Sequence, residues 1–444
     1  MDGVPLFAHR QANDVVAYQR GNAIHARQFL ADIEHLRAVL PTTKHLLLAC
    51  QDRYHFAVGF AAGLLSGRVS LLPSTQTPEV IRQLRQYAPD AYCLTDDPAC
   101  EIDLPKILFP AGPGPDPVAW SVPRIPADQL AACVFTSGST GVPIPHAKTW
   151  GPLVRSVTIE AERMGLAHGG GRAIVATVPP QHMYGLESSV LVALHSGNAF
   201  CAERPFFPGD IATALAAVPA PRVLVSTPVH LRTLLAVDVV LPPVELILSA
   251  TAPLSNKLAS ELEARYATPL LEIYGSTETG QIASRRTTAT EEWWLWPEVR
   301  LSTRDGQAWI DGGHVEAPTT MGDILEKVGD DHFLLYGRTA DLVNVAGKRS
   351  SLAFLDHQLM SIPGVLDGAF FLQEDSSESS GTGIARLGAL VVAPTLDATV
   401  IIRQLRERID PAFLPRPVLI IPAIHRNATG KLPRHVLQTL LTRS

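Results

Sequence analysis

Short apolar runs of strand length alternate with longer amphipathic segments along the first 275 residues of the chain. Their unbroken apolarity is typical of strands buried on both faces of largely parallel sheets. The runs are HLLLAC from His45, VSLLP from Val69, AYCLTD from Ala91, AIVATVP from Ala173, RVLVST from Arg222, LILSA from Leu246 and LLEIYG from Leu270. Residues 77–89 and 255–268 between them have the pattern of amphipathic helices, and Ser255 suits the N-cap of the second. The pattern predicts an α/β fold in which helices cover mostly parallel sheets.

The pattern of hydrophobic and polar residues changes after about Phe333. The segments FLLYGR and LVNVAGKR resemble the two strands of a hairpin, and a polar Ser/Gly tract follows at Glu374–Gly383. A compact α+β pattern occupies the remaining residues. We therefore expect a large N-terminal domain, 1–337, and a small mobile C-terminal domain, 338–444.

Composition limits the classes of function. A net charge of -6 argues against a nucleic-acid or membrane-surface binder, so a small-molecule partner is expected. Five cysteines without metal-site spacing suggest reduced thiols and no zinc site. The N-terminus lacks a signal pattern, and the apolar run Phe56–Leu65 is too short to cross a bilayer. A cytoplasmic location is expected, while nothing indicates the oligomeric state.

The stretch FTSGSTGVPIPHAK concentrates six Ser, Thr and Gly residues at Thr136–Gly141. Glycines allow backbone N–H groups to point inward, and hydroxyls add donors, so such a loop can surround polyphosphate oxygens. The alternative is a solvated linker. Neither a Walker loop nor a G-x-G-x-x-G fingerprint is present.

Four motifs in a fixed order give the loop a context: TSGSTGVP, YGSTETG (Tyr274–Gly280), GRTADLVNVAGKR (Gly337–Arg349) and NATGKLPR. Together they resemble the adenylate-forming superfamily, which includes acyl- and aryl-CoA synthetases. The resemblance implies an enzyme that activates a carboxylic acid with ATP and Mg²⁺ as an acyl-adenylate. A phosphopantetheine thiol, of CoA or of an acyl carrier protein, would then form a thioester.

The resemblance also implies a nucleotide site. Tyr274 would support the adenine ring, Ala252 would flank it, and Asp323 would accept hydrogen bonds from the ribose hydroxyls. Gly347 would lie near the incoming thiol. The full set is Thr136, Ser137, Gly138, Ser139, Thr140, Gly141, Lys148, Ala252, Tyr274, Gly275, Ser276, Asp323, Arg338, Gly347 and Arg349.

The same resemblance implies four catalytic residues, Thr277, Glu278, Lys431 and His182. Thr277 would contact phosphate, Glu278 would hold the metal ion, and Lys431 would bridge the carboxylate and the α-phosphate. Taken alone, Glu278 could simply charge the first turn of a helix, and Lys431 could be an ordinary solvated lysine. The order of the motifs favours the catalytic interpretation.

The segment PPQHMYGLESSV resembles the family's acyl-pocket segment, in which His182 would gate the carboxylate site. A core or capping histidine is the alternative. The expected pocket residues are His182, Tyr184, Gly185, Ser226, Thr227, Ser249 and Gly275. The short chain resembles bacterial aryl-acid ligases of aryl polyene and xanthomonadin-type pigment pathways. This favours an aromatic acid such as 4-hydroxybenzoate or a hydroxycinnamate, with a medium-chain or hydroxy fatty acid as the alternative.

The chain departs from the family pattern at several positions. Ile144 stands where a lysine is usual, and Lys148 could supply that charge or face solvent. Met321 replaces a threonine beside Asp323, and Ala340 occupies the hinge. These departures leave a non-catalytic nucleotide-binding scaffold as a competing function. AHGGGR mimics an esterase oxyanion loop, but no G-x-S-x-G elbow supports a hydrolase.

Overall fold

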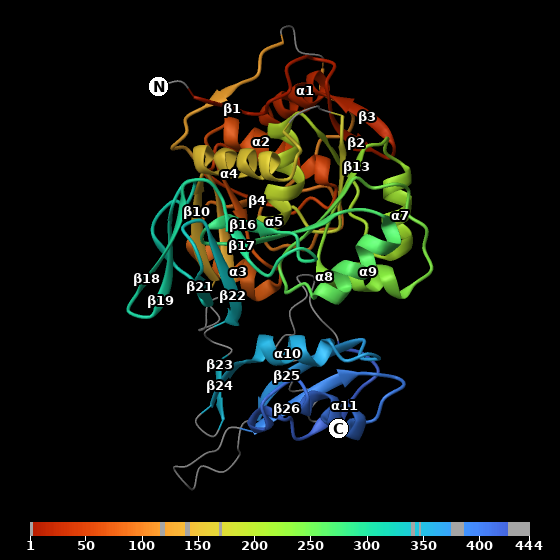
Figure 1. Cartoon of the computed structure of the whole chain (residues 1–444). Helices are drawn as coiled ribbons and strands as arrows, with labels where there is room; N and C mark the ends of the chain where they lie inside the picture. The colour runs from red at the N-terminus through yellow and green to blue at the C-terminus, as the bar shows by residue number, and fades with distance from the viewer. Residues whose placement is uncertain are drawn as a thin grey trace.

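The computed structural model describes residues 3–115, 120–137, 143–167, 171–338, 342–345, 348–373 and 386–424 of the 444-residue chain. Figure 1 shows a large body and, below it, a smaller body drawn in blue that carries α10, α11, β25 and β26. Helices and sheets are mixed in both. This architecture confirms the fold class predicted from the sequence, whereas the boundary at 337/338 and the mobility of the smaller part stay predictions.

A six-stranded sheet is built in the order β10-β9-β5-β4-β6-β7. All neighbours are parallel except β10, which returns antiparallel to β9. Its strands are β4 (His45–Leu48), β5 (Val69–Leu72), β6 (Tyr92–Thr95), β7 (Lys106–Leu108), β9 (Leu130–Ser137) and β10 (Pro143–Thr149). The helices of this region are α1 (Ala26–Arg37), α2 (Arg53–Leu65) and α3 (Pro78–Tyr87).

An eleven-stranded sheet follows the order β21-β22-β17-β16-β15-β14-β13-β11-β12-β2-β3. Its strands from β15 to β2 are parallel, and antiparallel strands extend both edges. They are β2 (Val15–Gln19), β3 (Asn22–His25), β11 (Ala173–Ala176), β12 (Ala199–Cys201), β13 (Arg222–Ser226), β14 (Leu246–Ser249), β15 (Leu270–Ser276), β16 (Gly280–Arg285), β17 (Trp293–Leu295), β21 (Asp323–Lys327) and β22 (His332–Arg338). All seven apolar runs are strands of these two sheets, as predicted.

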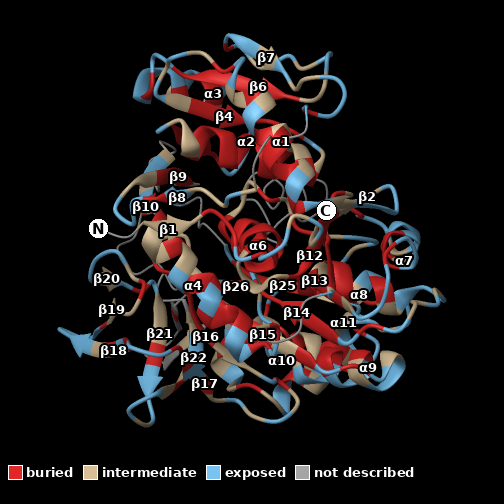
Figure 2. Cartoon of the chain, turned by 90° about the horizontal axis from the view of Figure 1, so that it is seen from above, coloured by how far each residue is buried: buried red, intermediate tan, exposed pale blue. Residues whose placement is uncertain are grey.

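Helices of the second sheet's region include the predicted segment that Ser255 caps. The Ser255 side chain accepts a hydrogen bond from the Leu258 backbone N–H, 3.2 Å away, which satisfies one of the unpaired donors of the first turn. The helices are α4 (Trp150–Arg163), α5 (Met183–Gly185), the π-helix η1 (Leu186–Leu191), α6 (Val192–Ser196), α7 (Pro208–Ala216), α8 (Pro228–Ala236) and α9 (Asn256–Tyr266). Figure 2 shows buried residues in α6 and strands β13 and β14, and exposed ones toward β18.

Two small sheets complete the large body. One pairs β1 (Val4–Pro5) with β8 (Arg124–Ile125). The other contains β18 (Val299–Arg304), β19 (Gln307–Gly312) and β20 (Thr319–Thr320).

The C-terminal part has a hydrophobic cluster of its own, formed by residues that include Val343, Leu355, Phe370 and Ile401. Its elements are β23 (Leu342–Val345), β24 (Lys348–Ser351), α10 (Leu352–Met360), β25 (Asp367–Gln373), β26 (Arg386–Val392), α11 (Ala398–Arg406), the 3-10 helix η3 (Pro411–Phe413) and β27 (Val418–Ile420). A separate core is what an independently packed unit requires.

The expected hairpin between FLLYGR and LVNVAGKR is wrong. FLLYGR is β22, which pairs with β21 and β17 in the large sheet, whereas β23 pairs with β24 in a separate two-stranded sheet. An apolar pattern predicts that a segment is extended but does not specify its partner, and β21 is separated from β22 by only four residues.

Candidate active site

The carboxyl ends of strands β13, β14 and β15 lie side by side. In the parallel register, Ser226 at the end of β13 is opposite Ser249 at the end of β14, and Ser249 is opposite Glu272 of β15. Ligands of open α/β sheets bind at this edge. The structure therefore places the predicted residues Ser226 and Ser249 at the edge where a binding site is expected, and β15 continues four positions further to Ser276.

The turn between β15 and β16 carries Thr277 and Glu278. Hydrogen bonds between Ser276 and Thr279 close it, since each backbone N–H donates to the other hydroxyl at 3.2 Å. Gly275 cannot carry a side chain here, because a Cβ would lie 2.2 Å from the Gly280 carbonyl oxygen. The turn is thus held tightly, and the Glu278 side chain keeps 38% of its surface exposed.

The β9–β10 hairpin carries the predicted phosphate loop at its tip. Thr136 on β9 lies opposite Ile144, and its hydroxyl is 2.9 Å from Nε2 of His146 on β10. This is a diagonal cross-strand pair, within reach of a long side chain. Gly138, Ser139, Thr140 and Gly141 lie outside the described residues, and Ser137 is described only through its backbone pairing with Pro143.

Two side chains of β10 contact the Glu278 turn. His146 Nε2 lies 3.6 Å from Glu278 Oε1, and Lys148 Nζ donates a hydrogen bond to the Glu278 backbone carbonyl at 2.7 Å. Lys148 is only 4% exposed, so the solvent-facing alternative is wrong. Burial lowers the pKa of Lys148, while Glu187, Glu316 and Glu278 oppose that shift. A phosphate contact by Lys148 stays a prediction.

Burial also lowers the pKa of the neighbouring His146 imidazole, with Glu278 raising it and Lys148 lowering it. Sequence reasoning missed His146. The signal was available, because His146 and Lys148 are two residues apart on a strand and so share one face.

Tyr274 and Asp323 form a second part of the site. The Tyr274 Oη donates to Asp323 Oδ2 at 2.6 Å, and the Tyr274 ring packs against Trp293 and Phe333. The backbone of Arg338 pairs with Asp323 across β21 and β22. Three predicted nucleotide residues therefore come from neighbouring positions of the sheet.

The remaining nucleotide residues are placed only in part. Ala252 is half-buried in the loop after β14, next to Thr251, whose φ is 78°. Arg349 is described through the backbone pairing of β24 with β23. Gly347 and the predicted catalytic Lys431 lie outside the described residues.

The predicted acyl-pocket residues lie in the segment after β11 and on or just after β13, β14 and β15. His182 occupies the N-cap position of α5, which contains the buried Tyr184 and Gly185. A Cβ on Gly185 would lie 1.9 Å from the Pro179 carbonyl oxygen. Beside this segment, the hydroxyl of Ser226 is 3.0 Å from that of Thr177.

Thr227 hydrogen-bonds to another side chain of its own helix region. Its hydroxyl lies 2.9 Å from Nδ1 of the buried His230 on α8. The Thr227 backbone carbonyl accepts the N–H of Leu231. Thr227 is therefore fixed at the start of α8, one residue beyond the end of β13.

Several buried polar atoms near this segment have no hydrogen-bond partner within the described part of the chain. They are Tyr184 Oη, Ser249 Oγ and Gln281 Oε1. Buried polar atoms usually find partners, and those that do not are candidates for ligand or water contact. Ser249 and Tyr184 were predicted from the sequence, but Gln281 was not.

Two fully buried carboxyl groups accompany them. Burial raises the pKa of Glu160 on α4 to about 8 and that of Glu187 on η1 to about 7. Ser156 donates to Glu187 Oε1 at 2.8 Å. Sequence reasoning missed both glutamates, although Glu160 lies three residues after Val157 on the apolar stripe of α4.

Arg53 anchors the strand end that leads to His182. This fully buried guanidinium donates to the backbone carbonyls of Ala176, Val178 and Cys201 and to the Ser189 hydroxyl. Burial lowers its pKa to about 10. It thereby ties α2 to β11, β12 and η1.

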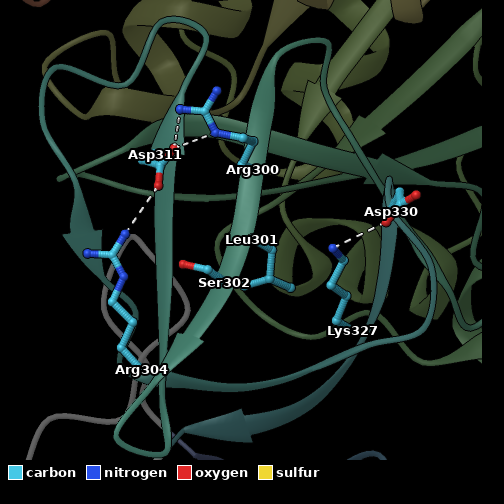
Figure 3. A pocket seen from close by; sticks show the side chains of 7 residues that line it. All are labelled: Arg300, Leu301, Ser302, Arg304, Asp311, Lys327 and Asp330. Carbon is cyan, nitrogen blue, oxygen red and sulfur yellow. Dashed lines mark hydrogen bonds and ion pairs between the residues drawn. The ribbon is translucent and has the colours of Figure 1, made fainter.

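A surface cavity of about 410 Å³ lies away from these residues (Figure 3). Lys327, which lines the cavity, is four positions along β21 from Asp323, a distance of roughly 13 Å at the rise of a strand. Arg300 and Arg304 pair with Asp311, and Lys327 pairs with Asp330. None of the predicted site residues lines the cavity, so it is not the candidate site.

Comparison with known proteins gives the family. A model of the family described as AMP-binding enzyme matches residues 45–304, more than half of the chain. The chain belongs to the AMP-binding enzyme family. The matched region includes the β9–β10 hairpin, the Glu278 turn and all the predicted acyl-pocket residues.

Two curated relatives of this AMP-binding protein are named 4-coumarate–CoA ligase. That of Rhodobacter capsulatus is 32% identical over 53% of this chain and 59% of its own length. That of Halorhodospira halophila is 28% identical over 67% of this chain and 73% of its own. The chain thus spans less than two thirds of the first relative.

A solved structure supports the fold across the whole chain. ATP-bound MatB from Rhodopseudomonas palustris has a TM-score of 0.82 at 18% identity, covering 98% of this chain and 97% of its own. At that identity the likeness establishes the shared fold.

Membrane spans and metal clusters are two further kinds of feature that the described residues could contain. Within the described ranges, no helix combines the length and apolarity that crossing a membrane requires. The same residues contain no group of three His, Cys, Asp or Glu side chains suited to a metal ion. The five cysteines are free.

Proposed function

We propose that this protein is an acid–thiol ligase that activates a carboxylic acid with ATP as an acyl-adenylate and transfers the acyl group to a phosphopantetheine thiol. The observation that carries the proposal is the contact between the phosphate-loop hairpin and the Glu278 turn, made by Lys148 and His146. It brings together the two segments that would hold the polyphosphate. The names of the two curated relatives agree with this reaction.

In the first half-reaction the carboxylate attacks the α-phosphorus of ATP and pyrophosphate leaves. Thr136–Gly141 and Thr277 would bind phosphate oxygens, and Lys431 would offset the charge that shifts between carboxylate and α-phosphate. In the second half-reaction the thiol attacks the acyl carbon and AMP leaves. The acceptor would be CoA or an acyl carrier protein, approaching near Gly347.

A Mg²⁺ ion fits the residues at the turn. Mg²⁺ usually binds one or two carboxylates and completes its coordination with water and substrate phosphates. Glu278 offers one partly exposed carboxylate beside the predicted phosphate loop, which suits that arrangement. The ion would neutralise phosphate charge when ATP is bound.

The proposed substrate is an aromatic acid with a polar substituent, such as 4-hydroxybenzoate or a hydroxycinnamate. The buried Tyr184 Oη and Ser249 Oγ support it, because each could hydrogen-bond to a polar group of the ligand. A plain medium-chain fatty acid would leave these atoms unsatisfied. His182 would gate the pocket, and a cytoplasmic location is proposed with it.

The experiment is pyrophosphate release trapped with hydroxylamine, across a panel of benzoates, hydroxybenzoates, cinnamates and fatty acids. We expect hydroxylated aromatic acids to stimulate ATP cleavage most. Preference for a fatty acid would reject the aromatic assignment. If no acid stimulates cleavage, the chain is a nucleotide-binding scaffold instead.

A further inference from the structure

Lys148 is a buried lysine whose surroundings differ from those of a phosphate-binding group. It is 4% exposed, and its Nζ donates a hydrogen bond to the Glu278 backbone carbonyl at 2.7 Å. A lysine that binds phosphate as a point charge needs an ammonium group that is open to the ligand. The ammonium of Lys148 is instead buried and directed at a backbone carbonyl.

The Nζ of Lys148 makes its hydrogen bond with a backbone atom. It donates to the Glu278 carbonyl at 2.7 Å, while Glu316 accepts from the backbone N–H and hydroxyl of Thr149, and Glu187 accepts from Ser156. A charged donor strengthens a hydrogen bond to a carbonyl in a buried site. The bond fixes the backbone from which the Glu278 carboxylate projects.

His146 adds a second connection from the same face of β10. Its Nε2 lies 2.9 Å from the Thr136 hydroxyl and 3.6 Å from Glu278 Oε1. The turn is therefore held at its backbone by Lys148, and its carboxylate lies beside the hairpin. The hydrogen bonds between Ser276 and Thr279 close the turn internally, whereas the contacts of Glu278 with Lys148 and His146 attach it to the hairpin.

We propose that Lys148 is a positioning residue that holds the Glu278 turn against the phosphate-loop hairpin, so that the carboxylate is oriented toward the metal ion of bound ATP. The proposal rests on the proposed function and deepens it. The lysine missing at Ile144 is then not replaced by another phosphate ligand. The charge of Lys148 acts on the nucleotide through Glu278.

The test compares nucleotide binding with and without Mg²⁺ by calorimetry, using a non-hydrolysable ATP analogue and the full chain. Lys148→Met keeps the length of the side chain but removes the hydrogen bond. We expect Mg²⁺ to improve the affinity of the wild type, and that improvement to shrink about 10-fold in Lys148→Met. In the absence of Mg²⁺, the affinity of Lys148→Met for the analogue should stay within about twofold of the wild-type value. The exposed Lys257→Met on α9 is the control and should match the wild type.

A double variant separates positioning from a general structural role. If Lys148 acts through Glu278, Lys148→Met should change Mg²⁺-dependent affinity little in a Glu278→Gln background. Additive losses would overturn the proposal. A loss of affinity that is equal with and without Mg²⁺ would also overturn it, because that result indicates direct phosphate contact.

The outcomes distinguish this inference from the proposed function. If the wild type does not bind the analogue with or without Mg²⁺, the proposed function fails and this inference fails with it. If the wild type responds to Mg²⁺ and Lys148→Met responds equally, only this inference fails. Thermal unfolding of each apo variant checks the fold, and Lys148→Gln, which is too short to make the bond, serves if Lys148→Met unfolds.

Discussion

Glu160 shows how one residue on an apolar helix face can acquire unusual acid–base behaviour. It is fully buried on α4, whereas Glu162, two residues further along the helix, is exposed. Burial raises the pKa of Glu160 to about 8 from the ordinary 4.5. Between about pH 4.5 and pH 8 the folded chain therefore holds a proton that the unfolded chain has released. The free energy of unfolding falls as the pH rises through this range.

We expect Glu160→Gln to remove the part of this dependence that Glu160 contributes, because the amide does not titrate. Glu187, whose pKa is raised to about 7, keeps its own contribution in both proteins. Between pH 5 and pH 8 the wild type should lose on the order of a few kcal/mol of unfolding free energy relative to the variant. Urea unfolding of both proteins at each pH measures the difference. Parallel pH profiles would show that Glu160 is not protonated in the folded chain.

At the residue scale, the sequence identifies groups that belong to motifs but not groups that packing brings to them. Glu278 and Tyr274 could be named from YGSTETG, and the structure places both at the β15–β16 end of the sheet. Glu187 and Gln281 could not be named, because their burial depends on how η1 meets β16. The contact of Lys148 with the Glu278 carbonyl joins residues 130 positions apart, which no local pattern predicts.

The segment that leads into η1 depends on one glycine. A Cβ at Gly185 would lie 1.9 Å from the Pro179 carbonyl oxygen, and the backbone there cannot yield easily because Arg53 holds Val178. We expect Gly185→Ala to destabilise the protein by about 3 kcal/mol or more and to displace His182. Thermal unfolding and acid-dependent pyrophosphate release measure the two effects.

Gly209→Ala on α7 is the matched control, since a Cβ there meets nothing within 4 Å. It should leave activity unchanged and stabilise the helix by up to about 1 kcal/mol. Equal behaviour of the two variants would show that the contact between Gly185 and Pro179 does not constrain the segment.

At the element scale, strands and capped helices could be predicted, but pairing could not. The seven apolar runs became strands because each is buried on both faces, and Ser255 caps α9 through its own hydroxyl. β22 pairs with β21 instead of β23 because register depends on neighbouring segments that a single strand pattern does not contain. The π-helical turn of η1 left no signal in its composition.

The two bodies of the molecule touch through specific side chains in this arrangement. Arg232 on α8 lies 3.6 Å from Asp367 on β25, and both are partly buried. An isolated pair of this kind contributes at most about 1 kcal/mol. It is therefore weak enough to allow a rotation that we propose for the small part, which would move Lys431 out and bring Gly347 to the thiol between the two half-reactions. The change in hydrophobic and polar pattern near Phe333 indicated two parts of the chain. It did not indicate the contact between Arg232 and Asp367.

Lys431→Ala tests whether this residue of the small part acts in adenylation but not in thioester formation. We expect it to slow adenylation by roughly 100-fold or more, because it removes the proposed charge at the α-phosphate. Thioester formation from a supplied acyl-adenylate should be largely spared. Pyrophosphate exchange and thiol acylation measure the two halves separately, and equal loss of both would contradict the rotation of the small part.

Transfer of oxygen-18 from the acid to AMP tests the central claim most directly. The acid with the highest turnover is labelled in its carboxylate, and the products of one reaction with ATP and a phosphopantetheine thiol are analysed by mass spectrometry. Attack of the carboxylate on the α-phosphorus leaves one labelled oxygen in AMP and the other in the thioester, and this is the result we predict. Unlabelled AMP, or ADP with the label in orthophosphate, would contradict an acyl-adenylate mechanism.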